Sequence, residues 1–328
     1  MYLHDVATPA LVIDAAALEH NLRTMAERLP GQRLRPHVKA HKCTALAKLQ
    51  QRHGHPAFCC ATVREAEGLA LAGLGEDLLL ANEVLDVERL ARLRYWPVIV
   101  AVDSSATIAA AAKAGIRRVI IDVNVGLPRC GCAPERAGAL AEEARRAGLE
   151  VVGVMGYEGH AVGIDDRALR ESLCAAAMKL LLAAHREVGG DIVSAGGTGT
   201  FDLNQWATEI QAGSYALMDT QYAKLGLPFR QALFVWATVI SVSDHYAVAD
   251  CGLKSLGMDH GNPAIDDAQV LFCSDEHVTF VPTRRVAVGE KIKVWPAHVD
   301  PTVAYHERML VTDGERVIES WPVDLRGW

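Results

Sequence analysis

The stretch RRVIIDVNVGLPRCGCAPERAGALAEEARRAGLEVVGVMGYEG, residues 117–159, decides the fold. The apolar runs at 117–125 and 150–159 predict strands buried on both faces, because each is almost continuously apolar and is bounded by turn residues. The segment 134–148 between them, rich in Ala, Glu and Arg, predicts a helix that ends at a glycine. This order predicts a strand–helix unit of a parallel sheet.

The same alternation of short apolar runs and helix-like segments occupies the first two-thirds of the chain. Eight strand candidates follow one another, at residues 34–40, 57–63, 77–82, 97–102, 117–125, 150–159, 191–197 and 209–217. Eight strand–helix units are the number that closes a parallel barrel. An open doubly wound sheet would carry a Gly-rich turn after its first strand, and this turn is missing. The sequence therefore predicts an α/β protein with a (β/α)8 TIM-type barrel.

The pattern changes after about Phe229. Short strand-like segments then follow one another with turns between them, and helical periodicity disappears. This pattern predicts a C-terminal, mostly antiparallel β domain. We expect residues 12–228 to form the barrel and residues 1–11 and 229–328 to form the β domain.

Composition and charge exclude several classes of protein. Half of the 328 residues are hydrophobic and 22% are charged, which suits a large core and argues against disorder. The net charge of −7, without a basic run, argues against nucleic-acid binding. No apolar stretch predicts a membrane span and no leader pattern is visible, so a cytoplasmic location is the default expectation. The eight cysteines form no CxxC pair, which argues against a zinc ribbon.

Lys39 is the first candidate for catalysis. It lies inside the first predicted strand, whose alternate side chains should point into the barrel. A buried lysine has a lowered pKa and can act as an amine nucleophile, the condition for a Schiff base with an aldehyde cofactor. The alternative is a lysine at a strand end that reaches solvent. Lys42 is the local rival, because it lies nearer the loop.

Two glycine-containing segments at the last two predicted strands indicate a phosphate site. SAGGTGT, residues 194–200, follows the seventh strand, and Gly213 lies at the eighth. Backbone N–H groups and hydroxyls in such a loop can bind a phosphate, and phosphate sites recur at this position in barrels. The alternative is a pair of ordinary glycine turns.

His298 and Asp300 form a candidate metal site in the predicted β domain. On a strand, residues two apart face the same side, so an imidazole nitrogen and a carboxylate oxygen would converge. Such a donor pair suits Mn²⁺ or Mg²⁺ better than an ion that prefers thiolates, and Zn²⁺ also stays open. Two ligands would leave the other positions to substrate or water. The alternative is a surface His–Asp pair.

Seven motifs together are similar to those of a known enzyme group. RPHVKAHK, GYEGH, SAGGTGT, QAGSYALMD, DCGLKSLGMDHG, SDEH and HVDPTV, in this order, resemble the D-threonine aldolase group of the alanine-racemase-like (fold type III) pyridoxal-phosphate enzymes. The resemblance runs from TPALVID near the start to HVDPTV near the end. It implies a homodimer, and it implies that pyridoxal 5'-phosphate and a divalent metal are the cofactors.

The resemblance also implies roles for individual residues. Lys39 would bind the cofactor aldehyde covalently, and His160 would lie near the reacting hydroxyl of the substrate. The remaining cofactor contacts would come from Arg129, Tyr157, Gly196, Gly197, Thr198, Gly213, Ser214 and Tyr215. His298 and Asp300 would bind the metal.

The implied activity is retro-aldol cleavage of D-3-hydroxy-amino acids, such as D-threonine, to glycine and an aldehyde. Related D-serine dehydratases have a cysteine where Asp300 stands, so the aspartate favours the aldolase. One alternative is a metal-dependent dehydratase of D-serine or D-3-hydroxyaspartate. Others are an amino-acid racemase, a non-catalytic carrier of the cofactor, or a barrel of unrelated chemistry.

Overall fold

A computed structural model describes residues 1–328, which form two compact units. The unit that we call the barrel unit consists of Met25–Lys39, Leu46–Gly213 and Gly327–Trp328. The unit that we call the β unit consists of Met1–Thr24, Ala40–Ala45 and Ser214–Arg326. The predicted domain boundaries at residues 12 and 228 stay predictions, since a compact unit is not by itself a domain that folds alone.

The barrel unit is built on seven parallel strands in the order β2-β3-β4-β5-β6-β7-β8. Their bounds are β2 Phe58–Cys60, β3 Leu78–Leu80, β4 Val98–Val102, β5 Arg118–Asp122, β6 Glu150–Gly156, β7 Ile192–Ala195 and β8 Glu209–Ile210. Residues 34–37 complete the ring, because Leu34 pairs with Ile210 and His37 pairs with Cys59, both in parallel. The predicted barrel is confirmed, with seven of the eight predicted strands present as strands, while the first predicted strand, residues 34–40, is present only as these two bridges.

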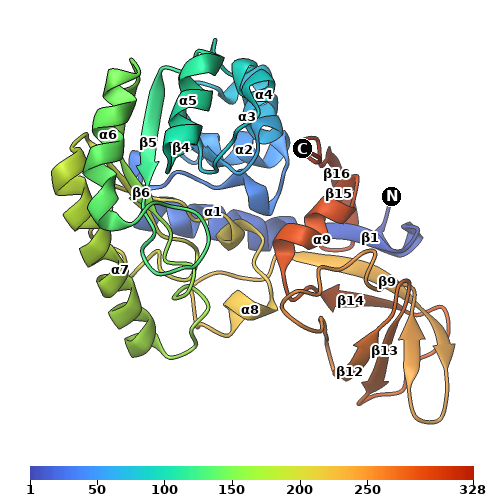
Figure 1. Cartoon of the computed structure of the whole chain (residues 1–328). Helices are drawn as coiled ribbons and strands as arrows, with labels where there is room; N and C mark the ends of the chain where they lie inside the picture. Colours follow the sequence, from blue (N-terminus) through green and yellow to red (C-terminus); the bar gives the residue numbers. More distant parts are fainter. The chain divides into compact units, whose positions relative to one another are not determined.

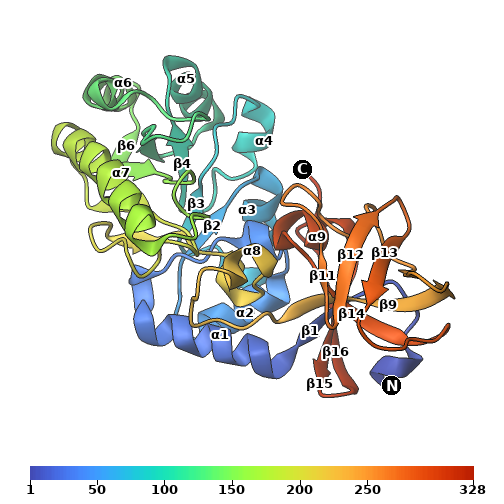
Figure 2. The same ribbon diagram turned by 90° about the horizontal axis from the view of Figure 1, so that it is seen from below.

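Helices follow the strands and cover their outer side, as the arrangement of α5, α6 and α7 around β4 to β6 shows (Figures 1 and 2). The helices that lie wholly in this unit are α3 Val63–Leu69, α4 Val87–Ala91, α5 Ser105–Ala114, α6 Ala137–Arg146 and α7 Arg167–Val188. Helices α1 Ala15–Arg28 and α2 Thr44–Arg52 each begin in the β unit and end in the barrel unit. In α6 the buried residues are Ala137, Leu140, Ala141 and Ala144, which is the spacing of one helix face. None of the helices is both long and apolar enough to span a membrane.

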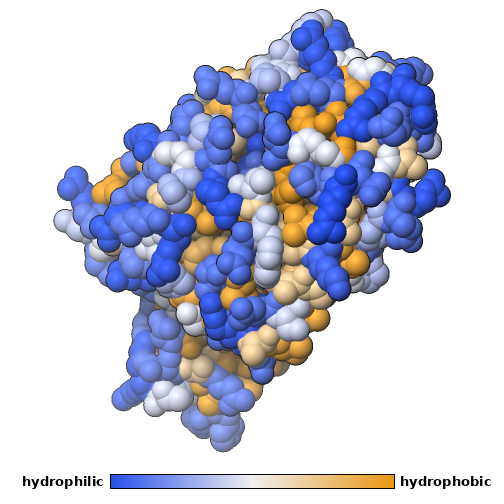
Figure 3. All heavy atoms as spheres, turned by 90° about the vertical axis from the view of Figure 1, so that its left-hand side faces the viewer, coloured by the Kyte–Doolittle hydropathy of each residue, from blue (hydrophilic) through white to orange (hydrophobic).

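The interior of the barrel is closely packed with apolar side chains, as a strand buried on both faces requires. One cluster of the core consists of Cys59, Leu79, Ile99, Ala101, Ile120, Val152 and Met155. On the face of the molecule seen in Figure 3, hydrophilic residues surround the exposed hydrophobic areas. The apolar runs that the sequence predicted as strands thus form the interior of the barrel unit.

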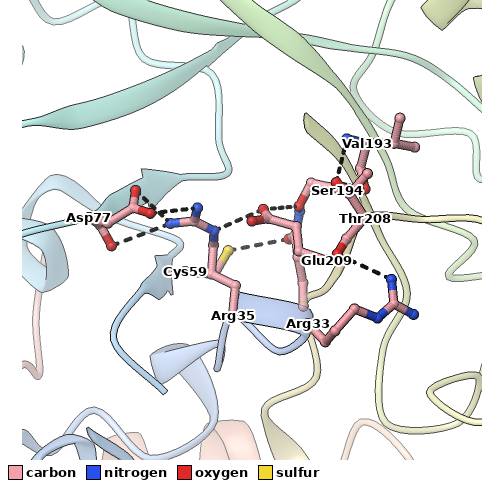
Figure 4. A network of polar contacts seen from close by, with 9 residues as sticks. Arg33, Arg35, Cys59, Asp77, Val193, Ser194, Thr208 and Glu209 are labelled. Carbon is pink, nitrogen blue, oxygen red and sulfur yellow. Dashed lines mark hydrogen bonds and ion pairs between the residues drawn. The ribbon is translucent and has the colours of Figure 1, made fainter. Parts of the chain in front are cut away.

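A buried ionic network lies where the ring of strands closes (Figure 4). Arg35 donates from Nε to Glu209 Oε1 at 2.8 Å and forms a two-pronged contact with Asp77, at 3.1 Å to each carboxylate oxygen. Ser194 Oγ donates to the same Glu209 oxygen at 2.6 Å. Burial alone would lower the pKa of Arg35, but the two carboxylates raise it above the ordinary value. The guanidinium therefore stays charged and joins the closing segment to β3 and β8.

The β unit contains a nine-stranded sheet in the order β10-β13-β12-β11-β14-β9-β1-β15-β16. Its strands are β1 Ala10–Asp14, β9 Leu233–Val242, β10 Ala247–Ala249, β11 Ala264–Ile265, β12 Ala268–Cys273, β13 Val278–Pro282, β14 Lys291–Trp295, β15 Arg308–Asp313 and β16 Arg316–Pro322. β10 also pairs with β9, so six of the strands close into a small barrel. Only β1 and β15 pair in parallel, and the predicted antiparallel β domain is confirmed.

Candidate active site

Lys39 lies just beyond the strand in which we predicted it. The strand pairing ends at His37, and Val38–Ala40 form a 3-10 turn. His37 Nδ1 accepts the backbone N–H of Lys39 at 3.4 Å, which bends the chain at this point. The prediction of a buried strand lysine is therefore wrong in detail, because the side chain is half-buried on a turn. The turn still follows the carboxyl end of the closing segment, where barrel enzymes carry their chemistry.

The positive charge of Lys39 acts on the thiol of Cys59, which is buried in the barrel. Burial raises the pKa of the Cys59 thiol, and the positive charges of Arg35 and Lys39 act in the opposite direction. Lys42, the rival lysine, belongs to the β unit, where its carbonyl oxygen accepts the N–H of Leu325 at 3.0 Å.

The segment GYEGH begins at the last residue of β6 and carries two predicted site residues, Tyr157 and His160, the first of which contacts a third, Arg129. The guanidinium carbon of Arg129 lies 5.5 Å from the centre of the Tyr157 ring. His160 packs closely on the loop that follows β5. A Cβ on Gly126 in this loop would lie 2.6 Å from the His160 ring. Its Nδ1 is buried without a hydrogen-bond partner. A buried polar atom in this state is costly unless a bound group satisfies it, so the histidine fits a role in ligand binding.

The loop 194–200 is buried over its whole length and is held by a residue that the sequence did not single out. Glu158, itself fully buried, accepts the N–H of Gly196 at 3.0 Å, the hydroxyl of Thr200 at 2.9 Å and the amide of Asn204 at 3.1 Å. The N–H of Gly197 donates to Thr200 Oγ1 at 3.2 Å. The amides of both glycines thus contribute to the shape of the loop itself.

Two glycines of the predicted phosphate site are required by close backbone contacts. A Cβ on Gly199 would lie 1.8 Å from the carbonyl oxygen of Val162. A Cβ on Gly213 would lie 2.4 Å from the carbonyl oxygen of His37. Any side chain at either position would displace backbone. These glycines therefore set the close packing of both segments, and Thr198, only 2% exposed, directly precedes Gly199.

His298 and Asp300 come together by a different route from the predicted one. They do not lie on a strand, because β14 ends at Trp295. His298 occupies the N-cap position of helix α9, Val299–Tyr305, without a side-chain capping bond, and Asp300 lies in the first turn of this helix. Pro301 fits this turn, because the first residues of a helix need no N–H partner. His298 Nε2 and Asp300 Oδ1 are nevertheless 3.9 Å apart. Two donors about 2.1 Å from one ion lie at most about 4.2 Å apart, so the pair fits a divalent cation.

One of the predicted cofactor residues contacts Asp300, and its chain neighbour lies in the core. Ser214 Oγ donates to Asp300 Oδ1 at 3.3 Å. Tyr215, fully buried, packs its ring against Phe229 with the ring centres 5.7 Å apart. Within the β unit, the structure thus associates Ser214 with the predicted metal pair and places Tyr215 in the core.

Asp219 is a further buried acid beside this pair. Its side chain accepts the N–H of Val299 at 3.1 Å and caps the short helix α8, Thr220–Ala223, through the N–H of Tyr222 at 3.0 Å. Burial raises its pKa to about 6, and the negative charge of Asp300 adds to the rise, while both N–H donors and His298 oppose it. The sequence carried a signal for the cap, since Asp before a helix start is a typical capping residue.

Two more residues near His298 were not predicted from the sequence. Asp259 Oδ2 lies 2.7 Å from His298 Nδ1, and the His260 ring stacks on the His298 ring with centres 4.0 Å apart. Both belong to the quoted motif DCGLKSLGMDHG, but no spacing links them to a histidine almost forty residues later in the chain. A possible donor atom from each of Asp259, His260 and His298 lies within 4.8 Å of the other two.

Residues 13–221 match the sequence profile of the family described as alanine racemase, N-terminal domain. The chain belongs to this family. Residues 232–312 of this alanine racemase family member match a second profile, described as a putative serine dehydratase domain. The resemblance to the alanine-racemase-like enzymes that the motifs indicated is confirmed.

This family member is similar in sequence or in structure to three enzymes. It is 34% identical to a 3-hydroxy-D-aspartate aldolase of Paracoccus denitrificans (strain Pd 1222), over 98% of this chain and 93% of the relative. The crystal structure of D-threonine aldolase from Filomicrobium marinum matches with a TM-score of 0.93 and 36% identity, over 99% of this chain and 97% of that chain. A D-threo-3-hydroxyaspartate dehydratase of Delftia sp. (strain HT23) is more distant, 28% identical over 77% of this chain and 73% of the relative.

Proposed function

We propose that this protein is an aldolase dependent on pyridoxal 5'-phosphate and a divalent metal that cleaves D-3-hydroxy-amino acids to glycine and an aldehyde. The observation that supports this most is the His298–Asp300 pair, with donors 3.9 Å apart, in a chain of the alanine racemase family. A racemase has no need of a metal at this position. The two aldolase relatives, which match almost the full length of the chain, support the same reaction.

The residues of the barrel unit would bind and orient the cofactor. Pyridoxal phosphate supplies an electron sink and the divalent ion a Lewis acid when they are bound. The Lys39 amine would hold the cofactor aldehyde covalently. The loop 194–200 and Gly213 would bind the phosphate, and Arg129 and Tyr157 would flank the ring.

Proton transfer and metal binding would fall to three other residues. His160, whose Nδ1 is buried without a partner, would take the proton of the substrate hydroxyl as the Cα–Cβ bond breaks. His298 and Asp300 would hold the ion, and we propose Mn²⁺ or Mg²⁺ because the donors are one nitrogen and one carboxylate oxygen. Zn²⁺ is the alternative. We also propose that the enzyme is a homodimer, which sedimentation of the active protein would test.

Product analysis tests this function directly. The purified protein, loaded with cofactor, would be incubated with D-threonine, D-phenylserine, D-3-hydroxyaspartate and D-serine, with and without Mn²⁺. We expect glycine and an aldehyde from at least one of the first three, and more product with Mn²⁺. Ammonia and a keto acid would instead identify a dehydratase. Racemised amino acid, formed equally in the presence of a chelator, would identify a racemase.

Glu158 should control the affinity for the phosphate of the cofactor. In the natural protein, three hydrogen-bond donors of this region point at the Glu158 carboxylate. In Glu158→Gln, the side-chain NH₂ group is itself a donor and cannot accept all of these hydrogen bonds, so the loop 194–200 loses its shape. Hydrogen bonds to a charged group contribute about 1.5–3 kcal/mol, so we expect roughly 10-fold to 100-fold weaker binding of pyridoxal phosphate. Fluorescence titration with pyridoxal phosphate and with pyridoxal would show that the loss is confined to the phosphate form.

A matched variant separates loop shape from charge. Glu171→Gln removes the same charge from an exposed position on α7 and should leave both affinities unchanged. Loss of a negative charge near a phosphate site would by itself tighten binding. Equal or tighter binding of pyridoxal phosphate by Glu158→Gln would therefore contradict the role given to Glu158.

A further inference from the structure

The two ring nitrogens of His298 face two different carboxylates. Nδ1 lies 2.7 Å from Asp259 Oδ2, which is hydrogen-bond distance, and Nε2 lies 3.9 Å from Asp300 Oδ1. An ionised carboxylate only accepts hydrogen bonds, so the proton of the neutral imidazole belongs on Nδ1. The lone pair is then on Nε2, on the side of Asp300, where a cation could bind it.

Asp259, His260 and His298 do not suit a metal of their own, although their donor atoms lie close together. The two imidazole rings are stacked, with 8° between their planes and 4.0 Å between their centres. The lone pair of an imidazole nitrogen lies in the ring plane, and two parallel planes have no common point at which both lone pairs could meet an ion. The hydrogen bond from His298 Nδ1 to Asp259 also occupies the nitrogen on this side.

The segment that carries Asp259 and His260 is fastened to helix α9. The N–H of Gly257 donates to Thr302 Oγ1 at 2.9 Å, and a Cβ on Gly257 would lie 2.3 Å from Pro301. The carbonyl oxygen of His260 accepts from Gln221 Nε2 at 2.9 Å. The hydroxyl of Thr302 in turn donates to the carbonyl oxygen of His298 at 2.7 Å. Asp259 and His260 are therefore held in place even though both side chains are partly exposed.

We propose that Asp259 and His260 are positioning residues that prepare His298 for metal binding. Asp259 would fix the tautomer through Nδ1, and His260 would fix the plane of the ring by packing on its face. Partners of this kind at the second nitrogen of a metal-binding histidine orient the ring and raise its basicity. This inference rests on one part of the proposed function, namely that His298 binds the metal ion.

The affinity of the cofactor-loaded protein for Mn²⁺, measured by isothermal titration calorimetry, tests this role without reference to turnover. Loss of such a partner typically costs about 10-fold to 100-fold in metal affinity, and we expect a loss of this size for Asp259→Ala. In Asp259→Asn, an amide oxygen still accepts the Nδ1 proton but without charge, so the loss should be smaller. His260→Ala should also weaken binding, because the His298 ring can then rotate.

Two controls separate this inference from its alternatives. Asp275→Asn removes the same charge from an exposed site paired with Lys254 and should leave the Mn²⁺ affinity unchanged. An unchanged affinity in Asp259→Ala, or an equal loss in Asp275→Asn, would overturn the positioning role. If His298→Ala binds Mn²⁺ as tightly as the natural protein does, the metal assignment of the proposed function falls, and the positioning role falls with it.

Discussion

Lys39→Ala is expected to remove the yellow absorbance of the lysine-bound cofactor and to lower turnover by about 10²–10⁴-fold, the range for loss of a positioned acid–base group. The reason is that no other amine on the turn Val38–Ala40 could replace it as the covalent partner of the cofactor aldehyde. Absorbance spectra of the protein mixed with cofactor, together with the rate of glycine release, would measure both effects.

Lys42→Ala is the matched control for this substitution. Lys42 is also half-buried and lies three residues further along the chain, but its backbone is tied to Leu325 in the β unit. We expect Lys42→Ala to keep the absorbance band. If Lys42→Ala loses the band and Lys39→Ala keeps it, the assignment of the amine is wrong.

Asp300→Ala is expected to eliminate stimulation by Mn²⁺ while the cofactor absorbance stays unchanged. A bound ion contributes several kcal/mol to stabilising charge in the transition state, so turnover should fall by about 10²-fold or more. Measuring rates over a Mn²⁺ titration and recording spectra of the same samples would separate the two effects. Asp300→Asn, which retains an oxygen for Ser214 Oγ, should show the same loss if metal binding and not local packing is responsible.

The control for Asp300 lies at an exposed position of the same unit. Asp313→Ala, at the end of β15, should retain full stimulation by Mn²⁺. Unchanged turnover in Asp300→Ala would exclude Asp300 as a ligand. The His298–Asp300 distance would then describe an ion pair of the helix terminus alone.

The barrel could be predicted from the sequence because its signal is local. Each strand is buried on both faces, so it appears as a short apolar run, as in Val98–Val102, where every residue is buried. The helices between them end at glycines such as Gly148, whose φ of 82° few other residues tolerate. Local patterns of this kind depend little on which distant residues they meet.

The details of the site depended on features that periodicity does not carry. The strand pairing ends at His37 and Lys39 follows on the 3-10 turn Val38–Ala40, although the apolar run in the sequence continues. Pro301 permits a helix start as well as a strand edge, so HVDPT was assigned to the wrong element while its donors still met. Asp259, His260 and Glu158 take their roles from contacts with distant segments, which one sequence alone does not reveal.

The ionic network at Arg35 has a consequence for redesign of the barrel. Removing one member of a buried ion pair leaves an uncompensated charge and typically costs about 3–5 kcal/mol, whereas replacing the whole set by apolar side chains of similar volume is often neutral or stabilising. Arg35 and Glu209, whose side chains are only 3% and 8% exposed, are therefore exchangeable only together. A library that varied them one at a time would show that each position tolerates no substitution, although the barrel could accept apolar side chains at these positions together.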